Sequence, residues 1–116
     1  MESTIEVSEE KKNDILILRL GGRLDAVTSP QLEKHVMSSI DDGNNSKVLM
    51  NFEKIEYLSS AGMRLLLSTT KKLKSKQGKF VIACVNDGVM EVIKMAGFDH
   101  ILNIRKTEQE GLGEFK

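Results

Sequence analysis

The sequence is poor in aromatic residues, cysteine and proline, and it carries no excess of charge of either sign. It has four Phe, one Tyr and no Trp in 116 residues, so there is little material for stacking nucleic-acid bases. Its 17 basic residues balance 17 acidic residues, which excludes a general polybasic binder of nucleic acid or membrane surfaces. The lone cysteine, Cys84, cannot close an internal disulfide, so we expect a reducing, cytoplasmic location.

Long apolar runs and secretory signals are also absent. Apolar runs such as residues 15–18, 63–67 and 80–85 fall far short of the ~20 residues of a membrane-spanning helix. The first six residues lack the basic and apolar segments of a signal peptide. We therefore expect no association with a membrane.

The sequence lacks the motifs of the common catalytic and metal sites. His35 and His100 are far apart, and neither has a neighbouring Cys or His at metal-ligand spacing. There is no glycine-rich phosphate loop and no Gly-x-Ser-x-Gly elbow, and the Gly-Leu-Gly run at 111–113 lacks the strand and full motif of a dinucleotide site. Cys84 falls in a predicted buried strand, which favours packing over reactivity. We expect no enzyme activity, no metal and no cofactor.

Strand and helix signals alternate along the chain. We predict strands over residues 4–7, 15–20, 47–52, 80–85 and 98–104, and helices over residues 30–40, 60–76 and 87–96. This order implies one α/β domain over residues 1–116, with a mixed sheet that opens with an antiparallel hairpin and carries helices on its faces. The core is expected within residues 4–105, and residues 106–116 are expected to form a polar, frayed tail.

Particular residues indicate where these elements begin and end. Gly21-Gly22 is expected to end the second strand. Ser29 followed by Pro30 is typical of a helix start, because serine caps unpaired amides and the first helical position needs no amide hydrogen. Gln77-Gly78 is expected to close the second helix, and Asn86 is the expected cap of the third.

The charge is unevenly distributed along the chain. Residues 1–60 hold 7 basic and 11 acidic residues, net −4, whereas residues 61–116 hold 10 basic and 6 acidic residues, net +4. The basic side chains gather near the end of the second helix: Lys71, Lys72, Lys74, Lys76 and Lys79. They are typical of a solvated helix end, where cations complement the helix dipole, and a docking surface for an acidic partner is the alternative.

Residues 55–67 combine an apolar strand end with two serines, a small residue, a glycine and an apolar helix. The first turn of a helix leaves backbone amides unpaired, and the helix dipole favours negative charge there. A serine at this place can carry phosphate, because the amides can bind its oxygens. From the residues alone, the simpler interpretation is structural: Ser59 caps the helix, and Ser60 is an ordinary residue of its first turn. Gly62 would keep the turn free of bulk and let a partner approach.

The same segment resembles the signature of the STAS domain of anti-sigma factor antagonists, through the run Tyr57-Leu-Ser-Ser-Ala-Gly-Met-Arg-Leu-Leu-Leu67. Three further stretches resemble, in order, that family's Gly-x-Leu-Asp loop, the strand before the signature and a late Gly-Phe turn: residues 22–25, 48–52 and 96–99. Asn51 stands where the family usually has Asp. The likeness covers residues 4–105, and the order and spacing of the stretches make it specific.

The resemblance implies a regulator that switches between partners. In this family a serine kinase that acts as an anti-sigma factor binds the antagonist and phosphorylates one serine, and a PP2C-type phosphatase resets it. The phosphoserine lies two residues before the signature glycine, which places it at Ser60; Ser59, where many members have Asp, is the second choice. The resemblance also implies a protein that is a monomer alone, with partner contacts from Asp25, Ser59, Ser60, Ala61, Gly62 and Met63.

The sequence leaves alternatives open at the level of function and of single residues. The same phosphoserine control could act on a target other than a sigma factor. The chain could also be an unphosphorylated scaffold or ligand-binding STAS domain. Asp25 is as well suited to capping the following helix as to binding a partner, and Met63 is as well suited to the core as to an interface.

Overall fold

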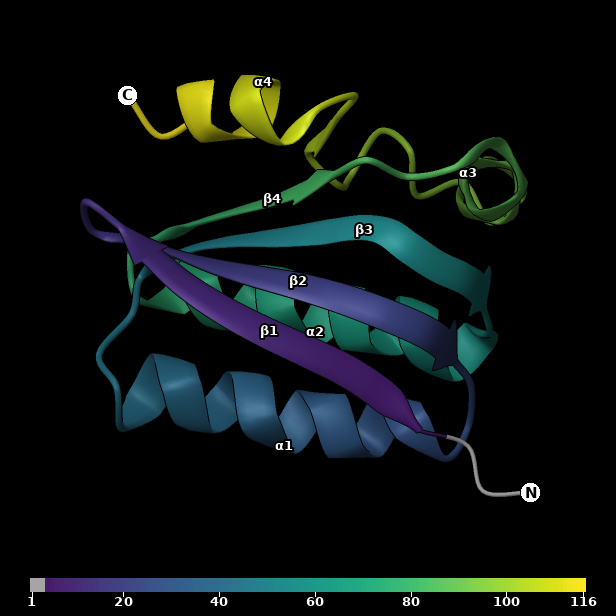
Figure 1. The fold of residues 1–116 in the computed structure, drawn as a ribbon, viewed down its shortest axis with the longest axis horizontal. Helices are drawn as coiled ribbons and strands as arrows, with labels where there is room; N and C mark the ends of the chain where they lie inside the picture. Colours follow the sequence, from purple (N-terminus) through teal and green to yellow (C-terminus); the bar gives the residue numbers. More distant parts are fainter. Residues whose placement is uncertain (1–3) are drawn as a thin grey trace.

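The computed structural model describes residues 4–116, which form a five-stranded sheet with helices on both sides (Figure 1). The strands lie in the order of the sequence: β1 (Ile5–Lys12), β2 (Ile15–Leu24), β3 (Lys47–Leu58), β4 (Lys79–Ala83) and β5 (Ile104–Arg105). β1 and β2 form an antiparallel hairpin, and the other three pairings are parallel. The predicted α/β fold, with its mixed sheet and opening hairpin, is therefore confirmed.

The helices α1 (Thr28–Asp41) and α2 (Ser60–Ser75) cover one face of the sheet (Figure 1). Successive side chains of a strand point to opposite faces, and those that point toward these helices form the larger core. Leu18, Met50 and Ile82 from the strands are fully buried there, together with Val36 of α1 and Leu66 of α2.

A short helix, α4 (Glu108–Gly113), covers the opposite face of the sheet (Figure 1). Ile17, Leu49 and Val81 are fully buried in the smaller core on this side. Gly111 allows close packing, because a Cβ at this position would lie 2.7 Å from Cδ1 of Leu49. The prediction of a frayed tail over residues 106–116 is therefore wrong, since most of this segment is helical and packed on the sheet.

Polar contacts from distant parts of the chain hold α4 in place. The Glu108 carboxylate accepts hydrogen bonds from Nε and Nη2 of Arg19, each at 2.9 Å, and from Nδ2 of Asn51 at 3.0 Å. Thr107 caps the helix by accepting from the Glu110 amide at 3.0 Å. Asn51, which departs from the family pattern, thus has a structural role in this chain.

These contacts predict that acid loosens the attachment of α4. The hydrogen bonds from Arg19 lower the pKa of Glu108 from its ordinary value of 4.5. A carboxylate with a lowered pKa stabilises the fold above its unfolded pKa, and this contribution disappears as the pH falls through its folded pKa. Below about pH 4.5, the free energy of unfolding in urea should therefore fall more steeply for the wild type than for Glu108→Gln. Equal slopes for the two proteins would contradict this prediction. Glu91→Gln, an exposed change on another helix, is the control and should follow the wild-type curve.

β2 does not end at Gly21-Gly22 as expected. It continues to Leu24, with register shifts against β3 between Arg19 and Gly21 and between Gly22 and Arg23. Gly22 adopts a φ of 110°, a conformation that favours glycine, so the strand is distorted rather than stopped. As a result, Leu24 pairs with Leu58 of β3, and Asp25 follows directly at the end of the sheet.

The helix α3 (Asp87–Met95) packs against the second half of β3. Asn86 caps it as predicted, by accepting from the Val89 amide at 2.8 Å, and its Nδ2 donates to the Ile55 carbonyl at 2.8 Å. The strand predicted over residues 98–104 is wrong in its extent, because only Ile104 and Arg105 form β5.

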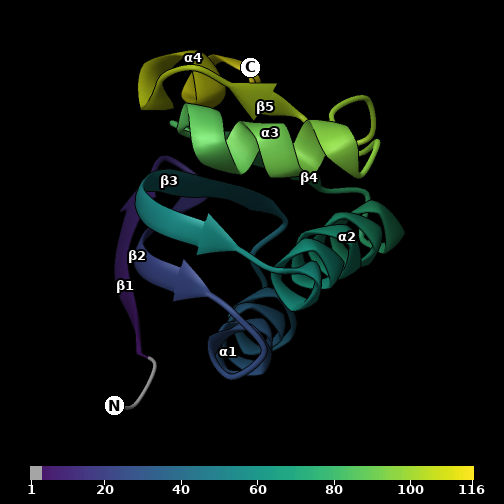
Figure 2. The same ribbon diagram turned by 90° about the vertical axis from the view of Figure 1, so that its right-hand side faces the viewer.

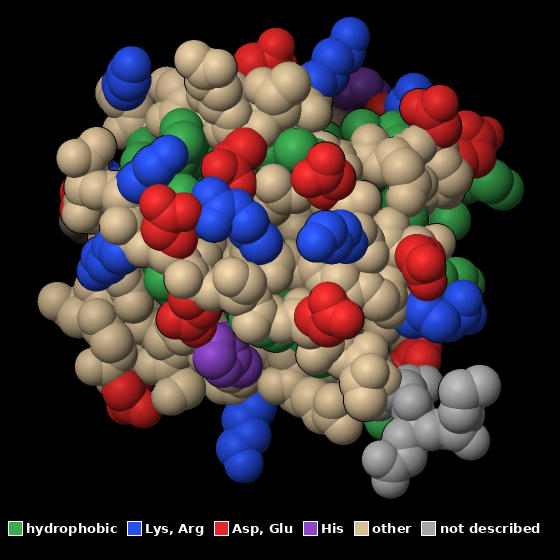
Figure 3. Space-filling model, in the orientation of Figure 1, with side chains coloured by type: hydrophobic (Ala, Val, Ile, Leu, Met, Phe, Trp, Pro, Cys, Tyr) green, Lys and Arg blue, Asp and Glu red, His purple; other side chains and the backbone are tan. Residues whose placement is uncertain are grey.

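The oppositely charged halves of the sequence meet in the fold. Asp41, at the end of α1, pairs with Lys72 at 2.9 Å and with Lys76 at 3.2 Å, both on or just after α2. On the face seen in Figure 3, acidic and basic side chains are interspersed. Asp41 therefore neutralises part of the charge of Lys72 and Lys76, whereas Lys71 and Lys74 of the same group remain exposed.

Candidate functional site

Two strand-to-helix connections lie side by side at one end of the molecule, which Figure 2 views end on. β2 leads into α1 and β3 leads into α2. Because β2 and β3 are parallel neighbours, both connections emerge at the same edge of the sheet. The Ser59 amide donates to the Leu24 carbonyl at 2.8 Å and joins the two connections. The segment singled out in the sequence therefore lies beside the loop that contains Asp25.

The two serines of the signature have different environments. Ser59 is extended and caps α2, its Oγ accepting from the Gly62 amide at 3.2 Å. Ser60 is the first residue of α2 and is exposed, and its hydroxyl has no hydrogen bond within residues 4–116. The amides of Ser60 and Ala61 likewise have no acceptor in this part of the chain. Only Ser60 therefore combines an accessible hydroxyl with unpaired amides nearby.

Gly62 and Met63 point into the protein rather than toward solvent. Both are buried, and Met63 belongs to the larger core with 4% of its surface exposed. A Cβ at Gly62 would lie 2.6 Å from Cδ1 of Leu58 and 3.1 Å from the Leu24 carbonyl oxygen. The glycine thus lets α2 begin close against the end of β2. Of the two roles considered for Met63, the structure places its side chain in the core.

Asp25 organises the loop between β2 and α1. Its carboxylate accepts from the amides of Val27 and Thr28, each at 2.9 Å, and Oγ1 of Thr28 donates to the Arg23 carbonyl at 2.5 Å. The prediction of a cap at Ser29 is wrong, because α1 begins at Thr28 and Asp25 already holds the amides ahead of it. The Ser29 hydroxyl is buried and has no partner among the described residues.

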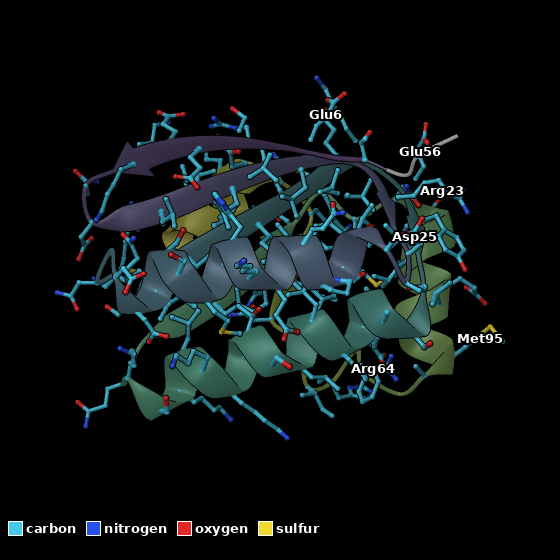
Figure 4. All side chains as sticks on the ribbon, turned by 90° about the horizontal axis from the view of Figure 1, so that it is seen from below. Glu6, Arg23, Asp25, Glu56, Arg64 and Met95 are labelled. Atoms are coloured by element: carbon cyan, nitrogen blue, oxygen red, sulfur yellow. The ribbon has the colours of Figure 1, made fainter. Side chains whose placement is uncertain are left out.

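Exposed apolar side chains come from the elements that meet at this end of the molecule. Val27 of the loop is 55% exposed, Tyr57 of β3 is 40% exposed, and Met95 of α3 is 82% exposed. The Arg23 guanidinium lies over the Tyr57 ring, 4.2 Å from its centroid. Figure 4 shows Arg23 and Met95 at the same end as Asp25. Sequence reasoning missed these side chains, because their exposure depends on how three elements meet.

The described residues 4–116 contain no group of three or more His, Cys, Asp or Glu side chains that could hold a metal ion. Within them, no helix is both long enough and apolar enough to cross a membrane. Burial raises the pKa of the Cys84 thiol, which keeps it protonated and suits packing beside α4. The arrangement of Ser60, with exposed apolar side chains at the same end, suits a surface for binding another protein.

The sequence matches the family model of the STAS domain over residues 6–111. It is 28% identical over 112 residues to BtrV of Bordetella bronchiseptica, named as a candidate anti-sigma factor antagonist, with 97% of this chain and 96% of that protein covered. An anti-sigma factor antagonist from Mycobacterium paratuberculosis is similar in structure, with a TM-score of 0.86, 22% identity, and coverage of 96% of this chain and 93% of that one.

The Bacillus cell fate determinant SpoIIAA in its phosphorylated form is also similar in structure. Its TM-score is 0.73 at 20% identity, and the match covers 96% of this chain and 100% of that chain. These structural matches show the same fold, and the family match extends over nearly all of the described residues. The protein therefore belongs to the STAS domain family.

Proposed function

We propose that this protein is an anti-sigma factor antagonist controlled by phosphorylation of Ser60. The unphosphorylated form binds a serine-kinase anti-sigma factor and thereby frees the sigma factor. Phosphate on Ser60 breaks the complex, and a PP2C-type phosphatase restores it in the cytoplasm. One observation carries the proposal: Ser60 is an exposed, unbonded hydroxyl at the start of α2, at the end of the molecule that exposes Val27, Tyr57 and Met95. The name of the Bordetella relative and the phosphorylated form of SpoIIAA support it.

The start of α2 can carry phosphate without a change of fold. A phosphoserine adds about −1.5 to −2 charges at neutral pH. The helix dipole and the unpaired amides of Ser60 and Ala61 favour negative charge at this place. The phosphate therefore acts on the partner, which must bury a charged group at an interface built for a hydroxyl.

The proposed contact surface follows from the same geometry. Asp25, Ser59 and Ser60 lie on the two adjacent connections and supply its polar side chains, and Ala61 adds an unpaired backbone amide. Gly62 and Met63 support this surface from below rather than touching the partner directly. The antagonist is proposed to act as a monomer, because one copy carries the whole surface.

Phosphopeptide mapping by mass spectrometry of the protein from its own cells tests this proposal. We expect a single phosphate on Ser60, because its hydroxyl is exposed whereas Ser59 Oγ accepts a hydrogen bond from Gly62. The change Ser60→Ala should abolish the phosphate, and Ser59→Ala should keep it.

Other results of the mapping would contradict the proposal in different ways. Phosphate on Ser59 in the wild type would move the site by one residue. No phosphate during growth or stress, with full coverage of the peptide, would favour an unphosphorylated scaffold or ligand-binding domain. Identifying the protein that leaves on phosphorylation would separate a sigma-factor pathway from another target.

A further inference from the structure

We infer that Arg64 binds the phosphate on Ser60 and so makes the start of α2 a self-contained phosphoserine site. This inference rests on the proposed phosphorylation of Ser60 and adds a positioning residue to it. Arg64 is exposed on α2 and has no hydrogen bond or ion pair within residues 4–116. The side chain is therefore available to a group that the unmodified protein lacks.

The helix geometry places Arg64 over the modified serine. Ser60 and Arg64 are four residues apart in α2, and side chains at this spacing are neighbours on one face, with about 5–6 Å between their Cβ atoms. Each Cα–Cβ bond of a helix tilts toward the N-terminus, so the long side chain of Arg64 covers the turn in which Ser60 lies. Figure 4 shows Arg64 toward the same end of the molecule as Asp25.

The order of the two charges favours the contact. An anion four residues before a cation is the stabilising arrangement in a helix, and an anion at the first position of α2 also complements the helix dipole. The planar guanidinium can donate two parallel hydrogen bonds to phosphate oxygens, which a lysine cannot do. The unpaired amides of Ser60 and Ala61 approach the phosphate from the N-terminal side of the same turn.

The other nearby cations are engaged elsewhere or lie too far along the helix. Arg23 stacks on the Tyr57 ring, and Lys72 pairs with Asp41. Lys71 is exposed and unpaired within residues 4–116, but it lies seven residues beyond Arg64, a rise of about 10 Å. Arg64 is therefore the side chain positioned to neutralise the phosphate, and Lys71 offers a matched control.

The test uses the full chain with phosphoserine incorporated at position 60, alone and combined with Arg64→Gln, Arg64→Lys or Lys71→Gln. Phosphorus NMR gives the midpoint of the second ionisation of the phosphate, and thermal unfolding gives the melting temperature. Removal of Arg64 by Arg64→Gln should raise the ionisation midpoint by about 0.3 pH units. The increase in melting temperature that phosphorylation brings should be smaller by about 2 °C in the Arg64→Gln protein. Arg64→Lys should recover part of both effects, and Lys71→Gln should cause neither.

An unchanged midpoint on Arg64→Gln, or an equal shift on Lys71→Gln, would overturn the inference. The melting temperatures are compared as a cycle with the unphosphorylated proteins, so that a direct effect of each substitution on α2 cancels. No partner protein takes part in these measurements. If an anti-sigma kinase binds the phosphoserine protein as tightly as the unmodified one, the proposed switch fails while the role of Arg64 stands. If the midpoint does not move, the role of Arg64 fails, and the proposed switch is judged by kinase binding alone.

Discussion

The substitution Ser60→Asp is expected to weaken binding to the anti-sigma kinase about a hundredfold while leaving the fold intact. A carboxylate at the first position of α2 suits the helix dipole, so the free energy of unfolding should not fall. In the complex the same carboxylate would have to lose water at an interface built for a neutral hydroxyl, which costs several kcal/mol. A loss of about 2.7 kcal/mol in binding already corresponds to a hundredfold. Isothermal titration calorimetry against the kinase measures the effect directly.

The uncharged substitution Ser60→Asn is the matched control for this prediction. It has nearly the size and shape of aspartate without its charge, so it should retain binding within a few-fold. Binding of the Ser60→Asp protein at the wild-type level would contradict a switch based on charge. An equal loss for Ser60→Asp and Ser60→Asn would point to steric exclusion instead. Either outcome can be interpreted once circular dichroism shows that both variants are folded.

The parts of the fold that depend on neighbouring residues could be predicted from the sequence. Ser59 and Asn86 cap α2 and α3 as expected, because each bonds an amide three residues ahead. The mixed sheet followed from the alternation of buried strands and amphipathic helices. The position of Ser60 at the start of a helix is of the same kind, since it follows from the cap immediately before it.

The features that depend on distant residues could not be predicted. Gly21-Gly22 was expected to end a strand, but pairing with β3 carries β2 past both glycines. Residues 106–116 were expected to form a polar tail, because the partners that hold them are far away in the sequence. Glu108 pairs with Arg19, and Gly111 packs on Leu49.

Contacts with residues outside the helices also decided which residues at the helix ends have their expected roles. The first turn of α1 is organised by Asp25 from the preceding loop, so the Ser29-Pro30 signal marks the start two residues late. At the end of α2, Gln77 and not Gly78 has the positive φ of 58°. Gly78 is needed for another reason, because a Cβ there would lie 2.1 Å from the Ser46 carbonyl oxygen.

The candidate site combines both kinds of feature. Its serines belong to a local motif, whereas the exposed side chains of Val27, Tyr57 and Met95 come together only when three elements meet. Gly62 shows the difference most clearly: its place in the signature suggested room for a partner, but its neighbours Leu24 and Leu58 belong to the protein itself. A glycine in a motif indicates that another segment packs closely against it. It does not tell whether that segment belongs to the same protein or to a partner.

The substitution Gly62→Val is therefore expected to damage both the stability and the switch. Its Cβ would stand 2.6 Å from Leu58 Cδ1, which can move, and 3.1 Å from the Leu24 carbonyl oxygen, which is fixed by its bond to the Ser59 amide. The first turn of α2 would have to shift away from β2, breaking that bond and displacing Ser60. Overpacking of a buried site of this kind costs about 3 kcal/mol, measurable as a loss of unfolding free energy in urea.

The control for this prediction is Gly88→Val in the first turn of α3. A Cβ at Gly88 would meet only Asn86 Oδ1, at 3.5 Å, so valine should change the stability by less than about 1 kcal/mol. Equal losses for the two substitutions would mean that glycine is required by the helix start itself rather than by the contact with β2. If Gly62→Val alone is destabilising and its remaining folded fraction is also a poor substrate for phosphorylation, the position of Ser60 depends on the packing of α2 against Leu24. The recognition surface would then be fixed from beneath by a residue that the partner does not need to touch.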